Sequence, residues 1–237
     1  ACLVGSEMCI RDRPNELVDG VTERTGGVPL FIEEVTRLLL DRGEQGDIHS
    51  IPPTLQQSLT ARLDRLGAAR EVAQIGAVIG RDFTYWLVRT VTRMEEAPLQ
   101  IALYRLAEAD ILLARGLPPQ SDYRFKHALI QDAAYENLLK SRRQVLHRRV
   151  AEALRDNAAT AAAEPELLAH HFTQAGMTEA AIEWWGKAGQ RSFEASALVE
   201  SAEQFKRALA QIATLPATTA LRREQIKLQV ALANALM

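Results

Sequence analysis

Residues 111–127 read ILLARGLPPQSDYRFKH, and this stretch decides the fold of the middle of the chain. Residues 111–114 form a short apolar run, and residues 123–126 alternate between aromatic and charged side chains. Between them, residues 116–122 are rich in Gly, Pro, Ser and Asp, which favour turns. Two short strand patterns around such a turn predict a β-hairpin.

Helical patterns surround this hairpin. The three that precede it cover residues 70–79, 85–92 and 95–109, and the two that follow cover residues 127–139 and 141–155. Three helices followed by a hairpin are the outline of a winged helix. We therefore predict a winged-helix-like domain over residues 69–156.

The segment before this domain predicts a small helical unit over residues 14–68. Residues 30–40, LFIEEVTRLLL, have the apolar spacing of an amphipathic helix and follow the breaker Gly26-Gly27-Val28-Pro29. Thr54 is the predicted N-cap of a second helix over residues 55–66. The adjacent Glu33 and Glu34 are interpreted as part of a solvated face.

The C-terminal part is built differently. Residues 151–237 contain 23 alanines, whereas residues 1–150 contain 14. Residues 156–164, DNAATAAAE, are predicted to form a soft linker, and helices then alternate with breaks at Gly176, near Ala197 and at Pro216. Small residues and aromatics recur at the spacing of a tetratricopeptide (TPR) helix, so we predict TPR-like helical repeats over residues 157–237.

The predicted fold class is therefore mainly all-α. It comprises a helical lid, a winged-helix domain with a small β-hairpin, and a TPR-like α-solenoid. The net charge, 28 − 30 = −2, argues against a surface adapted throughout to nucleic acid or anionic membrane. No apolar run reaches the roughly 18 residues of a membrane span. We therefore expect a soluble, cytoplasmic protein.

The opening segment, residues 1–13 (ACLVGSEMCIRDR), contains both cysteines. It has neither the apolar centre of a signal peptide nor a helical period. It resembles a translated sequencing-adapter junction, so we expect it to be non-native or disordered. This interpretation predicts that the chain is a fragment of a longer protein.

Motifs for catalysis are missing from the sequence. The Gly186-Lys187 pair lies in a helical pattern and is followed by Ala188, so it is not a Walker A motif. His170 and His171 are adjacent and lack HExxH spacing. We therefore predict no catalytic residue, no metal site and no enzyme activity or cofactor for this chain alone.

One helix carries a basic cluster, which consists of Arg142, Arg143, His147, Arg148 and Arg149. A winged helix beside such a helix suggests contact with DNA phosphates. However, these positions do not form one stripe, and nearby Glu and Asp residues dilute the positive field. Salt bridges within the fold or to another domain are the favoured interpretation.

Several segments resemble, in order, the C-terminal half of STAND-type AAA+ ATPase regulators, over residues 17–237. They are RTGGVPLFIEEVTRLLL, IPPTLQQSLTARLDRL, AQIGAVIGRDF, YRFKHALIQDAAYENLL, LHRRVAEAL and ELLAHHFTQAG. Members of this family are linked to adenylate or guanylate cyclases, to protein kinases or to LuxR-type regulators. The resemblance implies a parent protein that binds ATP or ADP with Mg²⁺ in an upstream nucleotide-binding domain.

The resemblance also implies two nucleotide-binding residues. Pro29, in Gly27-Val28-Pro29, matches the lid proline that packs near the adenine and ribose. His127 follows the hairpin where relatives carry Met-His-Asp, and there the histidine contacts the ADP phosphate. Ala128 stands at the aspartate position here, so the match is partial. The alternatives are a helix-capping or partly buried histidine at position 127 and a simple helix-start turn at Pro29.

The sequence therefore predicts a fragment of a nucleotide-dependent signal-transduction switch. The expected partners are the upstream domain of the same protein and a protein or small-molecule ligand on the repeats. One alternative is a TPR-like interaction scaffold with no nucleotide role, in which Phe172, Trp184 and Trp185 are groove anchors. Core packing explains these three aromatics at least as well. The other is a winged-helix DNA-binding regulator.

Overall fold

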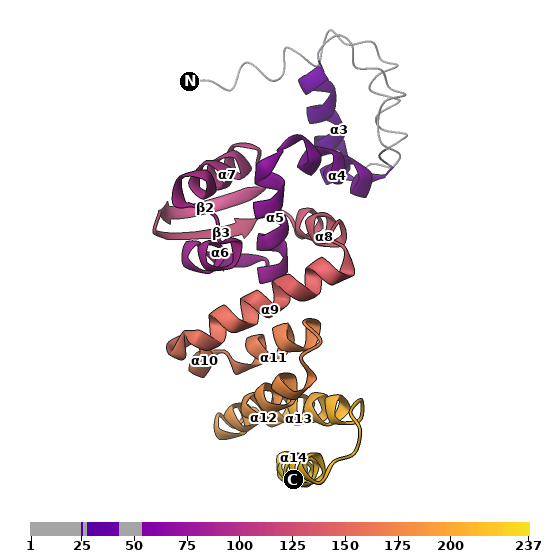
Figure 1. The fold of residues 1–237 in the computed structure, drawn as a ribbon. Coiled ribbons are helices and arrows are strands. Elements are labelled where there is room, and N and C mark those ends of the chain that lie inside the picture. Colours follow the sequence, from indigo (N-terminus) through magenta and orange to yellow (C-terminus); the bar gives the residue numbers. More distant parts are fainter. Residues whose placement is uncertain (1–24, 26–27, 43–53) are drawn as a thin grey trace. The chain divides into compact units, whose positions relative to one another are not determined.

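The computed structural model describes residue 25, residues 28–42 and residues 54–237, and these residues are mainly helical (Figure 1). Within them lie twelve α-helices and one small sheet of three strands. The prediction of a mainly all-α fold is therefore confirmed. The chain divides into two compact units, residues 1–70 and residues 71–237, and each is described by itself.

The first unit contains helices α3 (Pro29–Arg42) and α4 (Leu55–Arg65), which pack against each other. Their apolar faces bury Phe31, Val35, Leu59 and Leu63. The predicted N-cap is confirmed, because the Thr54 hydroxyl accepts a hydrogen bond of 3.2 Å from the Gln57 amide.

The solvated interpretation of Glu34 was wrong. Its side chain is only 3 % exposed, and its carboxylate pairs with the guanidinium of Arg62 from α4. Glu33 lies on the outer side of α3, where it pairs with Arg37 one turn later. A buried carboxylate needs a charged partner, and in the first unit the partner comes from the second helix.

The second unit begins within α5 (Ala68–Ile79) and continues through five elements to the end of the hairpin. They are β1 (Asp82–Thr84), α6 (Tyr85–Thr92), α7 (Glu96–Glu108), β2 (Leu112–Leu117) and β3 (Gln120–Phe125). The strands form an antiparallel sheet in the order β1-β3-β2. The predicted hairpin is confirmed, although its strands are longer and its turn is shorter than the sequence indicated.

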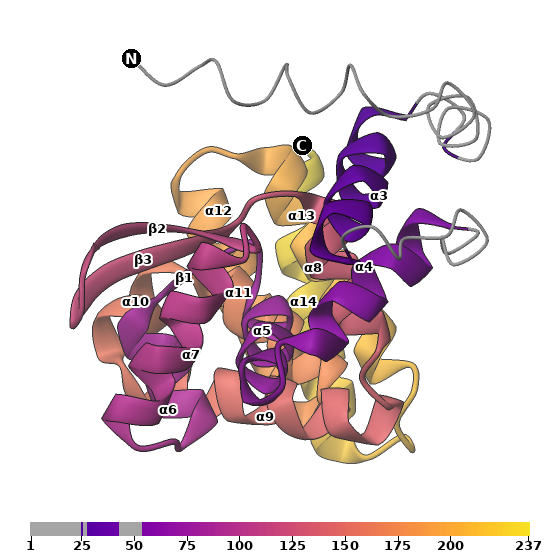
Figure 2. The ribbon, with the colours of Figure 1, turned by 90° about the horizontal axis from the view of Figure 1, so that it is seen from above.

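The core of this sheet-bearing region is aromatic. Phe83 of β1 stacks on Tyr123 of β3, with ring centroids 5.7 Å apart, and also contacts Phe125. Gly76 of α5 faces the Phe83 ring so closely that a Cβ there would lie 2.8 Å from it. Helices α6 and α7 pack against the strands (Figure 2).

Three helices lead from the sheet to the repeats: α8 (Ala128–Glu136), α9 (Lys140–Asp156) and α10 (Ala158–Ala163). The last of these corrects the sequence analysis, which predicted a soft linker over residues 156–164. Asn157 caps α10 by accepting a hydrogen bond of 3.2 Å from the Thr160 amide. Alanine has the highest intrinsic helix propensity, so a capped run of alanines forms a helical turn here.

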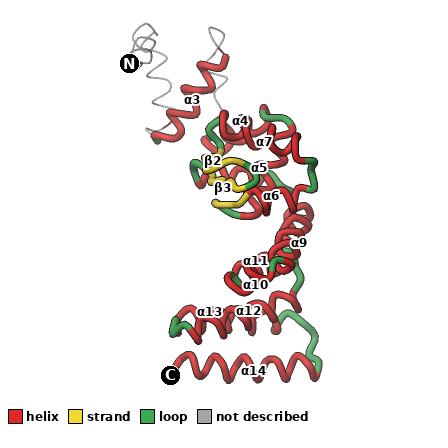
Figure 3. Tube along the Cα trace, turned by 90° about the vertical axis from the view of Figure 1, so that its left-hand side faces the viewer, coloured by secondary structure: helices red, strands yellow, loops and turns green. Residues whose placement is uncertain are grey.

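The remaining helices are α11 (Pro165–Gln174), α12 (Thr178–Glu194), α13 (Leu198–Ile212) and α14 (Thr219–Leu236). Each packs on the next, and Figure 3 shows them in succession. The predicted breaks are confirmed: Gly176 and Ser196 have positive φ angles, and Pro216 lies between α13 and α14. Gly189 of α12 lets the Phe205 ring of α13 approach, since a Cβ there would lie 2.5 Å from it.

Candidate functional site

His127 lies at the junction between β3 and α8, in extended backbone with φ −130° and ψ 141°. It occupies the N-cap position of α8, and its carbonyl accepts a hydrogen bond of 3.1 Å from the Ile130 amide. Its imidazole makes no capping hydrogen bond. The side chain is therefore not occupied in holding the helix terminus.

The imidazole of His127 has a buried nitrogen. In the described part of the chain, Nε2 is shielded from solvent and has no hydrogen-bond partner. A buried polar atom without a partner costs about 1–3 kcal/mol. Such an atom beside a helix N-terminus is a candidate contact for an anionic ligand.

The residues around His127 fix this junction. Phe125 is fully buried, and the Lys126 amide donates a hydrogen bond of 3.1 Å to the Ile111 carbonyl. The Lys126 ammonium lies 3.0 Å from the Asp110 carboxylate. Lys126 therefore pairs with Asp110. The imidazole of His127 remains as a polar side chain at the start of α8 that could contact a ligand.

Pro29 is the first residue of α3 and is exposed. The carbonyl of Val28 accepts hydrogen bonds of 3.0 Å from the amides of Phe31 and Ile32, which starts the helix. Proline suits this position because its fixed φ matches the helix and its missing N–H is not needed. Gly27 lies outside the described residues. Pro29 and His127 belong to different units, so each is described separately.

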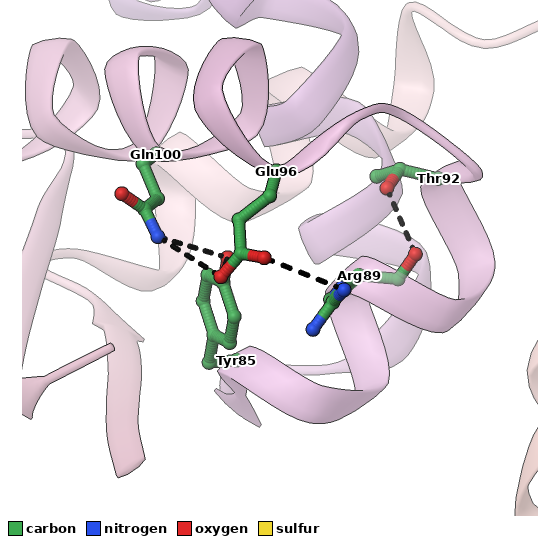
Figure 4. Close-up of polar contacts among 5 residues, drawn as sticks. All are labelled: Tyr85, Arg89, Thr92, Glu96 and Gln100. Atoms are coloured by element: carbon green, nitrogen blue, oxygen red, sulfur yellow. Dashed lines mark hydrogen bonds and ion pairs between the residues drawn. The ribbon is translucent and has the colours of Figure 1, made fainter. Parts of the chain in front are cut away.

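A polar cluster joins α6 to α7 (Figure 4). The Glu96 carboxylate accepts hydrogen bonds from the Tyr85 hydroxyl at 3.4 Å and from the Gln100 amide at 3.2 Å. Its other oxygen lies 3.4 Å from the Arg89 guanidinium. The Thr92 hydroxyl bonds the Arg89 carbonyl at 3.2 Å. The charge of Arg89 is thus directed toward Glu96.

The outer face of α7 is apolar and acidic. Ile101 and Tyr104 are 57 % and 64 % exposed. The Tyr104 hydroxyl donates a hydrogen bond of 2.7 Å to Glu108, and this contact raises the pKa of the tyrosine. Arg105 adds one cation to this face. A helix with this face lacks the dense positive charge that phosphate contacts require.

The basic cluster on α9 is used largely within the fold, as predicted. Arg142 pairs with Glu71 at 2.9 Å, and Arg148 pairs with Glu152 at 2.8 Å. Arg143 donates to the carbonyls of Leu138 and Glu136 and lies over the Tyr135 ring. His147 is buried, so it adds no surface charge.

A groove of about 930 Å³ lies between α12 and α14. Its apolar wall includes Ile182, Phe205 and Leu228. Two ion pairs border it, Lys187 with Glu183 at 2.7 Å and Lys227 with Glu224 at 3.0 Å. Its size suits a small molecule or a short peptide segment.

Three aromatics that the scaffold alternative treats as groove anchors are core residues, an interpretation that the sequence patterns support at least as well. Phe172, Trp184 and Trp185 are 1 %, 9 % and 5 % exposed, so they belong to the core. The Trp185 indole donates a hydrogen bond of 3.0 Å to the Thr173 hydroxyl, which ties α12 to α11. Their burial follows from the packing of successive helices, which a single-helix pattern does not specify.

The described residues contain no group of three His, Cys, Asp or Glu side chains arranged to hold a metal ion. None of the helices in those ranges combines the length and apolar character that crossing a bilayer requires.

One contact between two histidines was not predicted from the sequence, where the two residues were considered separately. His147 of α9 and His171 of α11 meet in the interior.

Comparison with known proteins gives two similarities. The family described as a domain of unknown function, DUF8739, matches residues 1–43. The uncharacterized protein R02095 of Rhizobium meliloti (strain 1021) is 34 % identical over 203 residues, which cover 82 % of this chain and 20 % of the relative. The chain thus spans about a fifth of the length of the curated relative it matches.

Proposed function

We propose that this chain supplies the lid, the winged-helix latch and the sensor repeats of a nucleotide-dependent signalling switch of the STAND ATPase class. The observation that carries the proposal is His127, whose buried Nε2 has no partner among the described residues and which begins helix α8. An imidazole N–H and a helix N-terminus are both suited to a phosphate.

The topology of the second unit supports the winged-helix part of this proposal. Its elements follow the order helix, strand, two helices and a hairpin, from α5 to β3. Strand β3 is central in the sheet and leads directly to His127. A side chain placed by regular elements rather than by a long loop suits a contact whose position must be reproducible.

The nucleotide in this proposal is ADP or ATP with Mg²⁺, bound mainly by an upstream domain of a longer protein. The phosphate of the bound nucleotide would hold the winged helix in a closed state, and loss of the nucleotide would allow an open state. His127 would donate a hydrogen bond from Nε2 to a phosphate oxygen, and Pro29 would pack against the nucleoside. Hydrolysis requires residues outside this chain.

The repeats would supply the input. The groove between α12 and α14 has an apolar wall and charged borders, which suit an amphipathic ligand. A ligand that binds the open state more tightly than the closed state would shift the switch toward release of ADP. The output would be a cyclase, a kinase or a transcriptional regulator, and the site of action would be the cytoplasm.

The test is the dissociation rate of ADP from a longer protein that carries the upstream nucleotide-binding domain. His127→Ala should accelerate dissociation by roughly tenfold, which corresponds to the loss of one charge-assisted hydrogen bond of about 1.5 kcal/mol. Basal output should rise in parallel. His170→Ala is the matched control, because it removes an imidazole from α11 and leaves His127 in place. Equal dissociation rates in the wild type and His127→Ala would remove His127 from the mechanism.

A protein-interaction scaffold is the second candidate, and the groove between α12 and α14 is the observation that favours it. The His127→Ala variant also distinguishes the scaffold from the nucleotide-dependent switch. A scaffold would bind its partner with the same affinity with or without ATP, and His127→Ala would leave that affinity unchanged.

Direct DNA binding draws less support. The exposed face of α7 presents Ile101, Tyr104 and Glu108, and Arg142 and Arg148 on α9 are engaged by carboxylates. Binding to duplex DNA that weakens with increasing salt would favour this alternative.

A further inference from the structure

Helices α9 and α11 meet at a pair of buried histidines. His147 of α9 and His171 of α11 are 2 % and 1 % exposed, respectively. Their Nδ1 atoms lie 2.8 Å apart, which is a hydrogen-bond distance. The pair lies where the helix that leaves the sheet-bearing region contacts the first of the helices α11–α14.

The pair belongs to a longer hydrogen-bonded chain. The Tyr135 hydroxyl of α8 lies 3.0 Å from Nε2 of His147. On the other side, the backbone of Ile79 at the end of α5 acts to raise the pKa of His171. Nε2 of His171 itself has no hydrogen-bond partner among the described residues. The chain thus runs from α8 through α9 to α11.

The contact between the two Nδ1 atoms requires a single hydrogen. One ring donates and the other accepts, so the accepting ring must be neutral, whereas the donating ring can be neutral or protonated. A second proton at this contact would place two N–H groups face to face and break the hydrogen bond.

The surroundings oppose that second proton. Burial lowers the pKa of His147 to about 4, with further lowering by His170 and Arg143. Burial also lowers the pKa of His171 to about 3, and His147 and His170 act in the same direction. Burial and Arg207 of α13 lower the pKa of His170. Tyr135 faces the pair from α8, and the charged side chain of α9 that acts on His147, Arg143, is positive.

We infer that His147 and His171 form a proton-sensitive lock that holds α11 on α9 while at least one of the two rings is neutral, and that acid weakens this lock. The lock is independent of the nucleotide role proposed above. Separation of the helices returns each imidazole to water, where its pKa is about 6.5. Protons therefore bind the separated state more tightly and favour it as the pH falls.

Apolar residues that do not titrate also lie on these two helices. Val150 and Leu154 of α9 and Leu168 and Phe172 of α11 are all buried. His170 of α11 does titrate, and its ring centroid lies 6.0 Å from that of His147. We therefore assign a difference in the stability of this contact between pH 7.5 and pH 5.5 to the three histidines.

Amide hydrogen exchange of the full chain at pH 7.5 and pH 5.5 tests the lock, with rates corrected for the intrinsic effect of pH. We expect protection in α11 to fall by up to about tenfold per pH unit for each histidine below pH 6.5. His171→Asn keeps an amide near the position of Nδ1 but cannot be protonated, so it should weaken this dependence. Thr173→Val is the matched control: it removes a hydroxyl of α11 that accepts a hydrogen bond from Trp185 but does not titrate, so it should keep the pH dependence of the wild type.

Two results would overturn the inference. One is protection in α11 that does not change between pH 7.5 and pH 5.5. The other is an unchanged pH dependence in His171→Asn. If that variant does not fold, ring-nitrogen NMR of the wild type decides the question. The lock requires a hydrogen on Nδ1 of one ring only at neutral pH and titration of both rings below pH 6. Titration of either ring near pH 6.5 would contradict it.

Discussion

The sheet-bearing region, from α5 to α8, and the helical repeats, from α11 to α14, each contain a histidine with a buried ring nitrogen, and they treat it differently. In the first region, Nε2 of His127 has no partner among the described residues. In the second, Nε2 of His171 likewise has no partner in the described part of the chain, but Nδ1 of His171 lies 2.8 Å from Nδ1 of His147. Histidine thus contributes to packing in the repeats, as His171, and remains available for a ligand at the start of α8, as His127.

The two histidines are therefore expected to differ in role: one contributes to the stability of the fold and the other to ligand binding. Removal of a buried polar group that has no partner relieves a cost, whereas removal of one member of a hydrogen-bonded pair leaves the other without a partner. The repeats should therefore depend on their histidine for stability. The sheet-bearing region should depend on its histidine only when a ligand is bound.

The largest expected effect that sharpens this comparison is the pH dependence of stability. His147 and His171 have pKa values of about 4 and about 3 in the folded chain, below the value of about 6.5 in the unfolded chain. The unfolded chain therefore binds more protons below pH 6.5. Full stability is present above that pH and falls by up to about 1.4 kcal/mol per pH unit for each histidine as the pH decreases.

Urea unfolding at pH 7.5, 6 and 5, followed by the fluorescence of Trp184 and Trp185 in α12, measures this dependence. The free energy of unfolding should be lower at pH 5 than at pH 7.5 by roughly 2–4 kcal/mol. A flat profile between these values would show that the two histidines titrate alike in the folded and unfolded chains.

The second effect is the contrast between two alanine substitutions at pH 7.5. His171→Ala should destabilise the chain by about 3 kcal/mol, because it opens a cavity and leaves Nδ1 of His147 without its partner. His127→Ala should change the free energy of unfolding by less than about 1 kcal/mol. Equal losses in the two variants, measured by urea unfolding, would abolish the distinction between the regions.

The smallest effect concerns a matched pair of glycines on α12. A Cβ at position 189 would lie 2.5 Å from the Phe205 ring, whereas one at position 186 would lie 3.4 Å from Leu228. Gly189→Ala should therefore destabilise the repeats by about 1–2 kcal/mol through overpacking. Gly186→Ala should stabilise them by up to about 1 kcal/mol through helix propensity. Thermal unfolding of both variants checks the sign, and stabilisation by Gly189→Ala would show that the contact between α12 and α13 is loose.

The elements that the sequence predicted best are those with local signals at both ends. Helix α6 begins after the capping Thr84 and ends before Arg93, as its apolar spacing indicated. The hairpin followed from a turn between two short apolar patterns. Strand β1 escaped prediction, because Asp82–Thr84 becomes a strand only by pairing with β3.

The polar interior was harder to predict than the elements. The burial of Glu34 depends on Arg62, which is 28 positions away in the sequence. The histidine pair joins residues that are 24 positions apart on two helices. One signal was present in the sequence: His147 shares the helical face of Val150 and Leu154, which predicts burial. The direction of its partner depends on how α11 packs, and no local pattern encodes that packing.

The most direct test of the central claim is an NMR spectrum of the histidine ring nitrogens, recorded on a longer protein that includes the upstream nucleotide-binding domain, with and without ADP. The account predicts that ADP shifts the Nε2 resonance of His127, while the ring resonances of His147 and His171 stay in place. An unchanged His127 resonance at saturating ADP would contradict the proposed role of this residue in nucleotide sensing.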